Sequence, residues 1–423
     1  MSMEVILSQL TLLLTVSIVI ILLLWIFRLY KISKYLSIIL TSIPYIYLLY
    51  VANLNHELSC SAIPILVILI VLLCSSSCLE IVDYKFTPAQ SLIYLIISYL
   101  SIFLILFKNF ITVACIWLVT SAIFAPLLAR ARSRSSIISC IKYLVFSAIG
   151  ATLLIFGISY LEVLRNVIII PILLILFGIA YELGIVPLHV WIPDVYKGSD
   201  RESVAMLASF MKIVAILALC RVFYSIDVSM NYTLFLTLST ISIITMFIGN
   251  LGALFSKDIE HILAFSTIAQ TGYGIAVLSV GFLNEKLLLP CLGVFIFHII
   301  SVAISKCALF IGLDTDYRNV RGISLIHALS LIGIPPLIGF WPKLFIILYI
   351  LSCGQVWLAI LVIANSVLSV PYYIKLYRNY RSSNVSRRLI IPLVILTALV
   401  IIIGIFYPVE MLRECIKIVN IVF

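Results

Sequence analysis

Four charged residues stand alone inside long runs of apolar residues: Glu182, Lys212, Lys306 and Lys343. A charged side chain at the centre of a membrane costs about 2.5–3.5 kcal/mol on insertion scales, so leucine would cost less at each position. Removal from water favours the neutral forms of lysine and glutamate, which lets both exchange protons near neutral pH. We therefore take the four residues as candidates for proton transfer. The alternative is that they form buried ion pairs that fix helix register.

Other polar residues accompany these charges. His298, Ser301 and Ser305 fall on one side of a predicted helix. Lys306 lies eight residues beyond His298, which places it about 80° around the helix axis. Water molecules could bridge that gap and extend a proton path. Three secondary candidates, which could line such a path or simply bond between helices, are His189, Gln270 and Tyr273.

The composition shows which environment holds these groups. Hydrophobic residues make up 64% of the chain and charged residues only 10%. Soluble domains are about half apolar and a quarter charged, so the bilayer must be the solvent for most of this chain. The net charge of +10 does not indicate nucleic-acid binding, because the charges fall in short gaps between apolar runs. Neither the ten cysteines nor the glycines match a metal, haem or nucleotide motif, so we expect no cofactor.

Successive apolar runs are long enough to cross a membrane, and they predict about fourteen transmembrane helices in an all-α integral membrane protein. The runs lie at residues 5–27, 35–53, 61–79, 88–107, 110–130, 141–161, 166–190, 202–225, 232–255, 259–281, 288–313, 321–350, 355–379 and 388–408. The first run lacks a basic leader and a small-residue cleavage site, so we expect a retained helix rather than a signal peptide. The loops are short and leave no room for a soluble domain.

The distribution of basic residues supports this division of the chain. When the loops are numbered in order, the odd loops hold about three times as many lysines and arginines as the even loops and the C-terminal segment together. Such a bias predicts that the odd loops face the cytoplasm or matrix and that both termini lie on the opposite side.

Two of the predicted helices contain matching interruptions. Gly184 and Pro187 in one run correspond, at a constant offset, to Gly333 and Pro336 in another. Proline removes a backbone donor and clashes with the preceding turn, so we expect both helices to break within the membrane. Paired breaks of this kind are typical of transporters built from inverted repeats. We therefore expect N-terminal helices at 1–87, five-helix repeats at 88–225 and 232–380, and a C-terminal helix and tail at 388–423.

Three segments resemble a known family. Residues 182–212 read ELGIVPLHVWIPDVYKGSDRESVAMLASFMK, residues 263–273 read LAFSTIAQTGY, and residues 328–337 read ALSLIGIPPL. They are similar to signatures of the antiporter-like subunits of respiratory complex I, and the wording is nearest to the subunit N branch. Those subunits share a fold with Mrp sodium/proton antiporters and membrane-bound hydrogenases. The resemblance covers roughly residues 90–380.

The resemblance implies roles for individual residues. Lys212 matches the central lysine of the first half-channel, and Lys343 matches the lysine at the second broken helix, near the outer exit. His298 and Lys306 resemble a histidine–lysine stretch of the larger antiporter-like subunits, although Val302 replaces its second histidine. The family implies a proton-translocating subunit of an NADH:quinone oxidoreductase that works with other membrane subunits and has no redox centre of its own.

The sequence departs from the family in the first half. Trp117 stands where the family usually has a glutamate, and Glu182 stands where its partner lysine should be. Glu182 could instead pair with Lys212, which would invert the local order of charges. Two alternatives therefore stay open: a subunit of a Mrp-type antiporter or hydrogenase, and a structural subunit that has lost pumping. The Ile-rich, Gln-poor composition favours a prokaryotic plasma membrane over the mitochondrial inner membrane.

Overall fold

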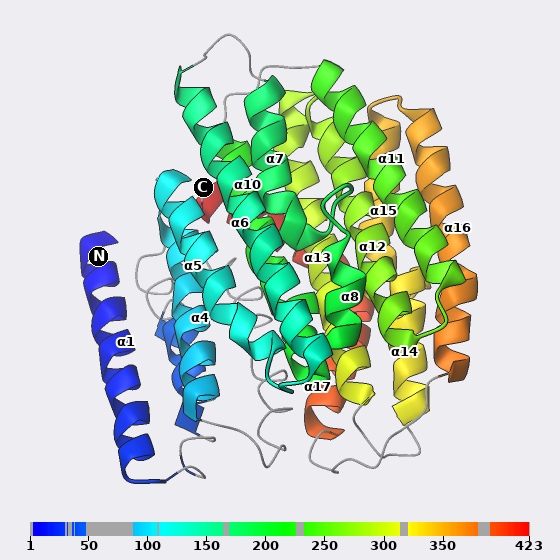
Figure 1. Ribbon diagram of the computed structural model, residues 1–423. Coiled ribbons are helices and arrows are strands. Elements are labelled where there is room, and N and C mark those ends of the chain that lie inside the picture. Colours follow the sequence, from blue (N-terminus) through cyan, green and yellow to red (C-terminus); the bar gives the residue numbers. More distant parts are fainter. Residues whose placement is uncertain are drawn as a thin grey trace.

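The computed structural model describes residues 3–29, 32, 36–37, 39–47, 88–107, 110–163, 169–225, 232–313, 320–379 and 390–422. Every regular element in these ranges is a helix, and the helices form one bundle (Figure 1). The predicted span at 61–79 and the end of the span at 35–53 lie outside the described residues. The all-α prediction is confirmed for the described part of the chain.

The helices form because long apolar runs can satisfy their backbone groups only internally in a membrane. The first part of the bundle contains α1 (Met3–Ile26), α4 (Pro88–Leu106), α5 (Phe110–Leu128), α6 (Arg134–Val163) and α7 (Ile169–Leu183). In the described ranges, eight helices are long and apolar enough to cross a membrane, or up to nine if a bent pair counts as one span. Shorter apolar helices accompany them. The count of fourteen spans therefore stays a prediction.

Both predicted breaks are present. Helix α7 ends at Leu183 and α8 (Trp191–Gly198) follows; likewise α14 (Val320–Ile332) is followed by α15 (Phe340–Ser352). Gly184 and Gly333 have φ angles of 84° and 94°, a left-handed conformation that favours glycine. Each lies just after its helix, where it ends the helix without a side-chain clash. The structure therefore confirms the breaks, while the assignment of two inverted repeats stays a prediction.

The predicted span at 202–225 contains one candidate membrane span, Arg201–Cys220, with a local irregularity at Ser209. We expected a continuous helix over 202–225, but the structure has α9 (Arg201–Ala208) and α10 (Phe210–Ser225) with Ser209 between them. The Ser209 hydroxyl donates to the carbonyl of Ala205 at 2.6 Å, and its backbone N–H donates to Met206 at 3.3 Å. A serine that bonds back to the preceding turn bends a helix, which explains the interruption.

The C-terminal segment also differs from the prediction, which ended the last helix near residue 408. Helix α17 (Ile390–Phe406) is followed by α18 (Pro408–Val422), bent by 96° from it. Helix α18 buries Met411, Cys415 and Val419 and exposes charged residues on its other side. Because α18 packs on the bundle along one side only, its other side is polar and its sequence contains no continuous apolar run.

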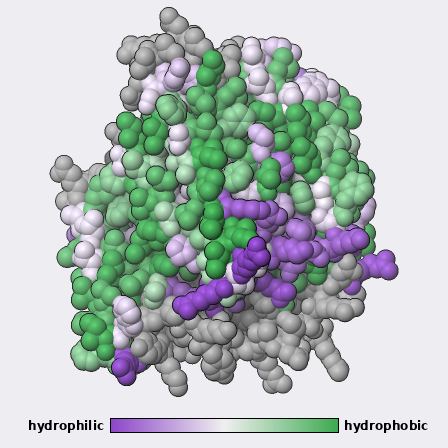
Figure 2. All heavy atoms as spheres, in the orientation of Figure 1, coloured by the Kyte–Doolittle hydropathy of each residue, from purple (hydrophilic) through white to green (hydrophobic). Residues whose placement is uncertain are grey.

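The central helices carry the candidate residues. Helix α12 (Ile259–Gly281) packs against α11 (Tyr232–Phe255) and α13 (Glu285–Gly312), and α13 also touches α10, α14, α15, α17 and α18. The helical segment Arg201–Cys220 and α12 are almost wholly buried in the bundle, whereas α1 lies at its edge and is mostly exposed (Figure 1). The visible face is largely hydrophobic, with hydrophilic residues gathered toward its lower end (Figure 2). Such an apolar exterior fits a lipid environment.

Candidate functional site

The first broken helix meets a buried lysine. The Lys212 amine, on α10, donates to the main-chain carbonyl of Glu182 at the end of α7. The last carbonyls of a helix lack partners within it and carry its partial negative charge, so they suit an ammonium group. Both residues are buried. The break therefore supplies the acceptor that holds this lysine inside the bundle.

The Glu182 carboxylate has a different partner from the one expected. Its Oε2 accepts a hydrogen bond from the hydroxyl of Tyr143 at 3.0 Å, and its Oε1 has no hydrogen-bond partner. Among the ion pairs of the described residues, none joins Glu182 to Lys212. Lys212 therefore touches the backbone of Glu182 rather than its side chain, and the acid–base pairing stays a hypothesis.

Aromatic side chains surround this site. The Trp117 indole donates to the Tyr181 hydroxyl at 3.0 Å, and the Trp191 indole donates to the Tyr181 carbonyl at 3.0 Å. The Lys212 amine lies 5.7 Å from the centre of the Trp191 ring. The structure thus brings Trp117, the residue that stands in place of an acid, to a tyrosine adjacent to Glu182.

The second broken helix holds a lysine in the same way. The Lys343 amine, on α15, donates to the carbonyls of Leu331 at 2.8 Å and Ile332 at 2.9 Å, which end α14. It also lies 4.9 Å from the centre of the Tyr273 ring, a distance that suits a cation–π contact. Lys343 is buried. A helix break thus gives a membrane lysine its acceptors in both halves of the chain.

His298 and Gln270 complete the second site. The His298 Nε2 atom lies 2.9 Å from the Gln270 carbonyl, which can only accept, so Nε2 carries the proton. Its Nδ1 atom has no partner, and its ring stands edge-on to Tyr273 with 6.0 Å between ring centres. The Gln270 amide donates to Leu331 at 3.0 Å. We call Lys343, His298, Gln270 and Tyr273 the Lys343 cluster.

Lys306 lies apart from this cluster. Its amine donates to the carbonyl of Leu263 at 2.6 Å and to the hydroxyl of Ser266, both on α12. The neighbouring Ser305 donates to the hydroxyl of Ser330 on α14 at 3.4 Å. Lys306 and His298 therefore make no direct hydrogen bond, in keeping with their predicted separation around the helix, and Ser301 and Ser305 are the polar residues between them on α13.

Helix α12 joins the two broken helices. The Thr271 hydroxyl donates to the Leu183 carbonyl, at the end of α7, at 2.8 Å. The adjacent Gln270 donates to the Leu331 carbonyl, at the end of α14. Consecutive side chains of one buried helix thus reach the carbonyl ends of both breaks, which makes α12 a polar link between the two sites.

Two further histidines occupy distinct places. His189 is half-buried in the turn after the first break, and its Nδ1 atom has no partner. His327 was not among the predicted site residues. It is fully buried in α14, and its Nε2 atom lies 3.0 Å from the hydroxyl of Thr397 on α17. A single histidine in an apolar run matches no motif, and the only signal was its unusual polarity at that depth.

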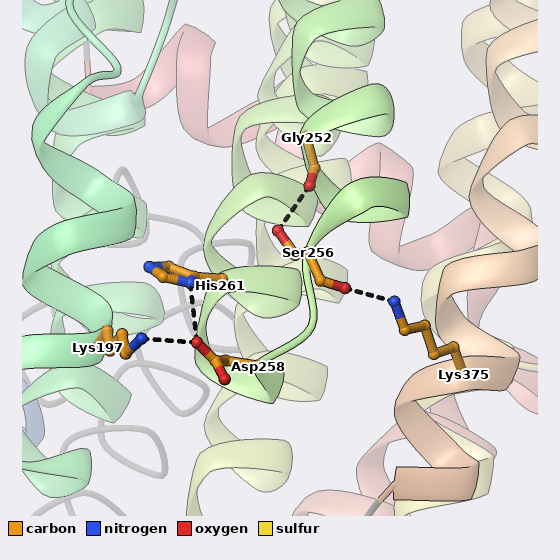
Figure 3. A network of polar contacts seen from close by, with 6 residues as sticks. All are labelled: Lys197, Gly252, Ser256, Asp258, His261 and Lys375. Carbon is orange, nitrogen blue, oxygen red and sulfur yellow. Dashed lines mark hydrogen bonds and ion pairs between the residues drawn. The ribbon is translucent and has the colours of Figure 1, made fainter.

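Charged side chains outside the spans gather at one end of the bundle. Lys197, after the first break, pairs with Asp258 at 2.7 Å, and His261 approaches the same carboxylate at 3.3 Å (Figure 3). The hydrogen bond that Lys197 donates to Asp258 lowers the pKa of Asp258 and raises the pKa of Lys197. Lys375 on α16 (Val356–Asn379) donates to Ser256 beside them at 2.5 Å. This network ties together loops that the sequence assigns to one side of the membrane.

The described residues do not assemble a metal site, since no three potential metal-ligating side chains come together among them. The chemistry that the two sites offer is instead the exchange of protons among amines, a carboxylate, an imidazole and hydroxyl groups. Amines and imidazoles can each hold or release one proton, whereas an indole N–H can only donate a hydrogen bond.

The sequence matches the family model described as NADH:quinone oxidoreductase/Mrp antiporter, TM, over residues 108–369. Among curated relatives, NADH-quinone oxidoreductase subunit N 2 of Solidesulfovibrio magneticus is 27% identical over 288 residues, which cover 61% of this chain and 61% of the relative. The subunit N of Cytophaga hutchinsonii is 26% identical over 337 residues, covering 70% and 74%. The chain thus spans about three fifths of the length of the first of these relatives.

Solved structures share the fold. A chain of the Mrp complex from Dietzia sp. DQ12-45-1b superimposes with a TM-score of 0.82 at 18% identity, covering 100% of this chain and 98% of that one. A chain of respiratory complex I from Thermus thermophilus gives a TM-score of 0.73 at 20% identity, covering 94% and 98%. At these identities the likeness establishes the arrangement of helices.

Proposed function

The chain belongs to the NADH:quinone oxidoreductase/Mrp antiporter family of membrane proteins, and on that premise we propose that it is an ion-translocating, antiporter-like subunit of a complex I-type quinone oxidoreductase. Its apolar helices and bacterial relatives make it a multi-pass protein of the bacterial plasma membrane. The ion would be a proton, since the buried groups are ones that gain and lose protons.

The observation that carries this proposal is the repeated lysine site. Lys212 and Lys343 are buried, and each places its amine against the carbonyl end of a broken helix. Carbonyl ends stabilise an ammonium group, while the surrounding apolar helices favour the neutral amine. A lysine held between these two tendencies can change its protonation state during transport.

The remaining residues would act as follows. His298 would accept a proton at its bare Nδ1, and Lys306 would hold one beside Ser266 on α12. Glu182 would exchange a proton with the Tyr143 side of the first site. His189, Gln270 and Tyr273 would orient these groups and the waters between them. We further propose that residues 88–225 and 232–380 form the two repeats, each organised around one break.

The electron-transfer chemistry would take place in partner subunits. Relatives named as NADH-quinone oxidoreductase subunits support membership of an oxidoreductase complex. The proposed partners are therefore other membrane subunits of such a complex. The matching chains of the Mrp complex and of complex I both share the fold of this chain, so the structural likeness does not distinguish the two assemblies.

The proposal is tested by purifying the whole complex through a tag on this chain and reconstituting it into vesicles. We expect quinone reductase subunits to copurify and NADH with quinone to drive proton uptake that an uncoupler abolishes. A complex that instead exchanges sodium for protons without a redox substrate would establish the Mrp alternative. Electron transfer without any ion uptake would establish the structural alternative.

A further inference from the structure

We propose that His327 is a proton relay that connects the second broken helix to the basic end of the molecule, which the charge bias assigns to the cytoplasm. The inference rests on the proposed function, because it concerns how protons reach the Lys343 cluster and Lys306. It assigns a role to a residue outside the motifs that define the family resemblance.

The depth of His327 suits a relay. His327 lies seven residues from the start of α14, and its partner Thr397 lies seven residues from the start of α17. At 1.5 Å per residue, both are about 10 Å inside the helix ends. Contacts join α14 to α17, and the two side chains meet at 3.0 Å. His327 thus stands midway between the basic loops and the break at Gly333.

The hydrogen bonds fix the state of the imidazole. The Thr397 hydroxyl donates its only proton to the Leu393 carbonyl at 2.7 Å. It can therefore only accept from His327, so His327 Nε2 carries the proton and donates. Nδ1 is left with a free lone pair, and it has no partner although the residue is fully buried. The tautomer presents a basic nitrogen inside the bundle.

Serines of the same helix continue the path in both directions. Ser324, His327 and Ser330 are spaced three residues apart and are all buried, and the other residues of α14 from Ile323 onward are apolar. Residues at this spacing are neighbours on a helix surface, about 5–6 Å apart between Cβ atoms. One water molecule can bridge such a gap. The stripe therefore runs from the start of α14 toward its broken end.

The inner end of the stripe reaches groups already assigned to transport. The Ser330 hydroxyl accepts from the backbone N–H of Gly339 at 3.3 Å and from the Ser305 hydroxyl at 3.4 Å. Ser305 adjoins Lys306, and the carbonyl next to Ser330 is that of Leu331, which holds Lys343. The stripe thus ends between the two lysines of the second half.

The proton balance is simple. A hydronium ion on the basic side gives its proton to Nδ1, which leaves a neutral water and forms an imidazolium that still donates through Nε2 to Thr397. The imidazolium then releases that proton from Nδ1 to a water beside Ser330, whose hydroxyl already accepts from Gly339 and Ser305 and donates its own hydrogen bond to that water. One proton moves inward, the imidazole returns to its starting state, and no electron is transferred.

The competing explanation is that His327 only clamps α14 to α17. Such a contact needs only the Nε2–H donor, which Thr397 accepts, and it makes no use of the Nδ1 atom that has no partner. The side-chain amide of glutamine would also donate a hydrogen bond, and it extends about as far from the backbone as the histidine Nε2 atom. The relay and the clamp therefore predict opposite orders of effect for two substitutions, His327→Gln and Thr397→Val.

The experiment measures protons taken up per electron in vesicles that contain the whole complex. We expect His327→Gln, which keeps the donor to Thr397, to lower this ratio about tenfold, which is less than the roughly 10²–10⁴-fold contribution of a positioned acid–base group. We expect Thr397→Val to keep at least half of it. Wild-type uptake in His327→Gln, or a larger loss in Thr397→Val, would overturn the proposal.

Two further variants keep the test decisive. If His327→Gln does not assemble, Ser330→Ala takes its place, because it interrupts the stripe without touching the contact with Thr397. A normal ratio in Ser330→Ala would then overturn the relay. Lys343→Met is measured in parallel: full uptake in that variant contradicts the proposed function itself, whereas loss there with normal uptake in His327→Gln contradicts only the relay.

Discussion

The two broken helices bind a buried lysine in the same way, but the side chains around the two lysines differ. Each ends on a left-handed glycine and offers its last carbonyls to a buried lysine. Around Lys212 the neighbours are Trp191 and other aromatic residues. Around Lys343 they include an imidazole and an amide on neighbouring helices. The comparison shows that a helix break can hold a lysine among aromatic rings as well as beside an imidazole and an amide, so the break alone does not define what surrounds the amine.

The difference lies in how many groups can pass a proton on. In the first half, Trp117 occupies the neighbourhood of Glu182, and an indole cannot carry a proton. In the second half, Lys343, His298 and Lys306 can each bind and release one, and Ser305 on α13 bonds to Ser330 on α14, the helix whose carbonyl end holds Lys343. We therefore expect the second half to contribute more to transport.

The largest effect is expected from Lys343→Met, which removes the charge but keeps much of the side-chain length. Because the carbonyls of α14 then face no ammonium group and the cluster loses its central proton carrier, we expect uptake to fall by about a hundredfold, with assembly and electron transfer retained. Proton uptake is measured by dye quenching in vesicles energised with NADH and quinone.

A matched control is Lys286→Met, which removes an exposed lysine near the start of α13 in the same half of the chain. It should pump as the wild type does. Equal loss in the two variants would show that any missing lysine disturbs the complex, and the comparison between the halves would fail.

A smaller effect is expected from Lys212→Met. The substitution leaves the Glu182 carbonyl without its donor, which costs about 1–3 kcal/mol, but it interrupts a region with few other proton carriers. We expect at least half of the wild-type uptake in the same vesicle assay, with a lower melting temperature. Loss of uptake in Lys212→Met alongside full uptake in Lys343→Met would show that the roles of the halves are reversed.

Trp117→Phe should affect stability and leave transport unchanged. It removes the hydrogen bond to Tyr181, which contributes about 1 kcal/mol, and leaves the apolar packing largely in place. Melting of the purified complex measures the loss. Trp341→Phe, which removes a similar bond to Gly404 in the second half, is the control for losing an indole. A rise or fall in uptake on Trp117→Phe would show that the indole takes part in transport.

The smallest effect is expected at the surface network that joins the two halves. Lys197 lowers the pKa of Asp258, so the pair stabilises the folded state above the ordinary aspartate pKa of about 3.9 and loses that effect as pH falls through the lowered value. Asp258→Asn should therefore lower the melting temperature slightly at pH 7, and the difference should vanish in acid and shrink in high salt.

Glu410→Gln is the control for this surface prediction, since it removes an exposed carboxylate that pairs only with Arg413 of its own helix. It should change the melting temperature less than Asp258→Asn does. A difference between Asp258→Asn and the wild type that grows as pH falls would contradict the assigned sign.

The sequence predicted the parts of the fold that local chemistry determines. Apolar runs predicted most of the described helices, and Gly184 and Gly333 with the prolines that follow them predicted both breaks. It did not predict the division at Ser209, because a hydroxyl that bonds to the preceding turn leaves the hydrophobic pattern intact. Helix α18 was not predicted either, because the charged residues on its polar side interrupt the apolar run.

The candidate site was predicted in its residues more than in its contacts. The resemblance indicated Lys212, Lys343 and His298, and the structure buries all three. The acceptors of the two lysines are backbone carbonyls, which have no side-chain signature in a sequence. His327 was missed for a related reason, since its partner Thr397 lies on a helix far along the chain.

The central claim is that the second half holds the more continuous polar path, and an experimental structure of the assembled complex with its ordered waters tests it most directly. We predict a chain of waters and side chains that joins Lys306, His298 and Lys343, and a gap in the waters beside Trp117. Continuous water between Glu182 and Lys212, together with a dry region around Lys343, would contradict the claim.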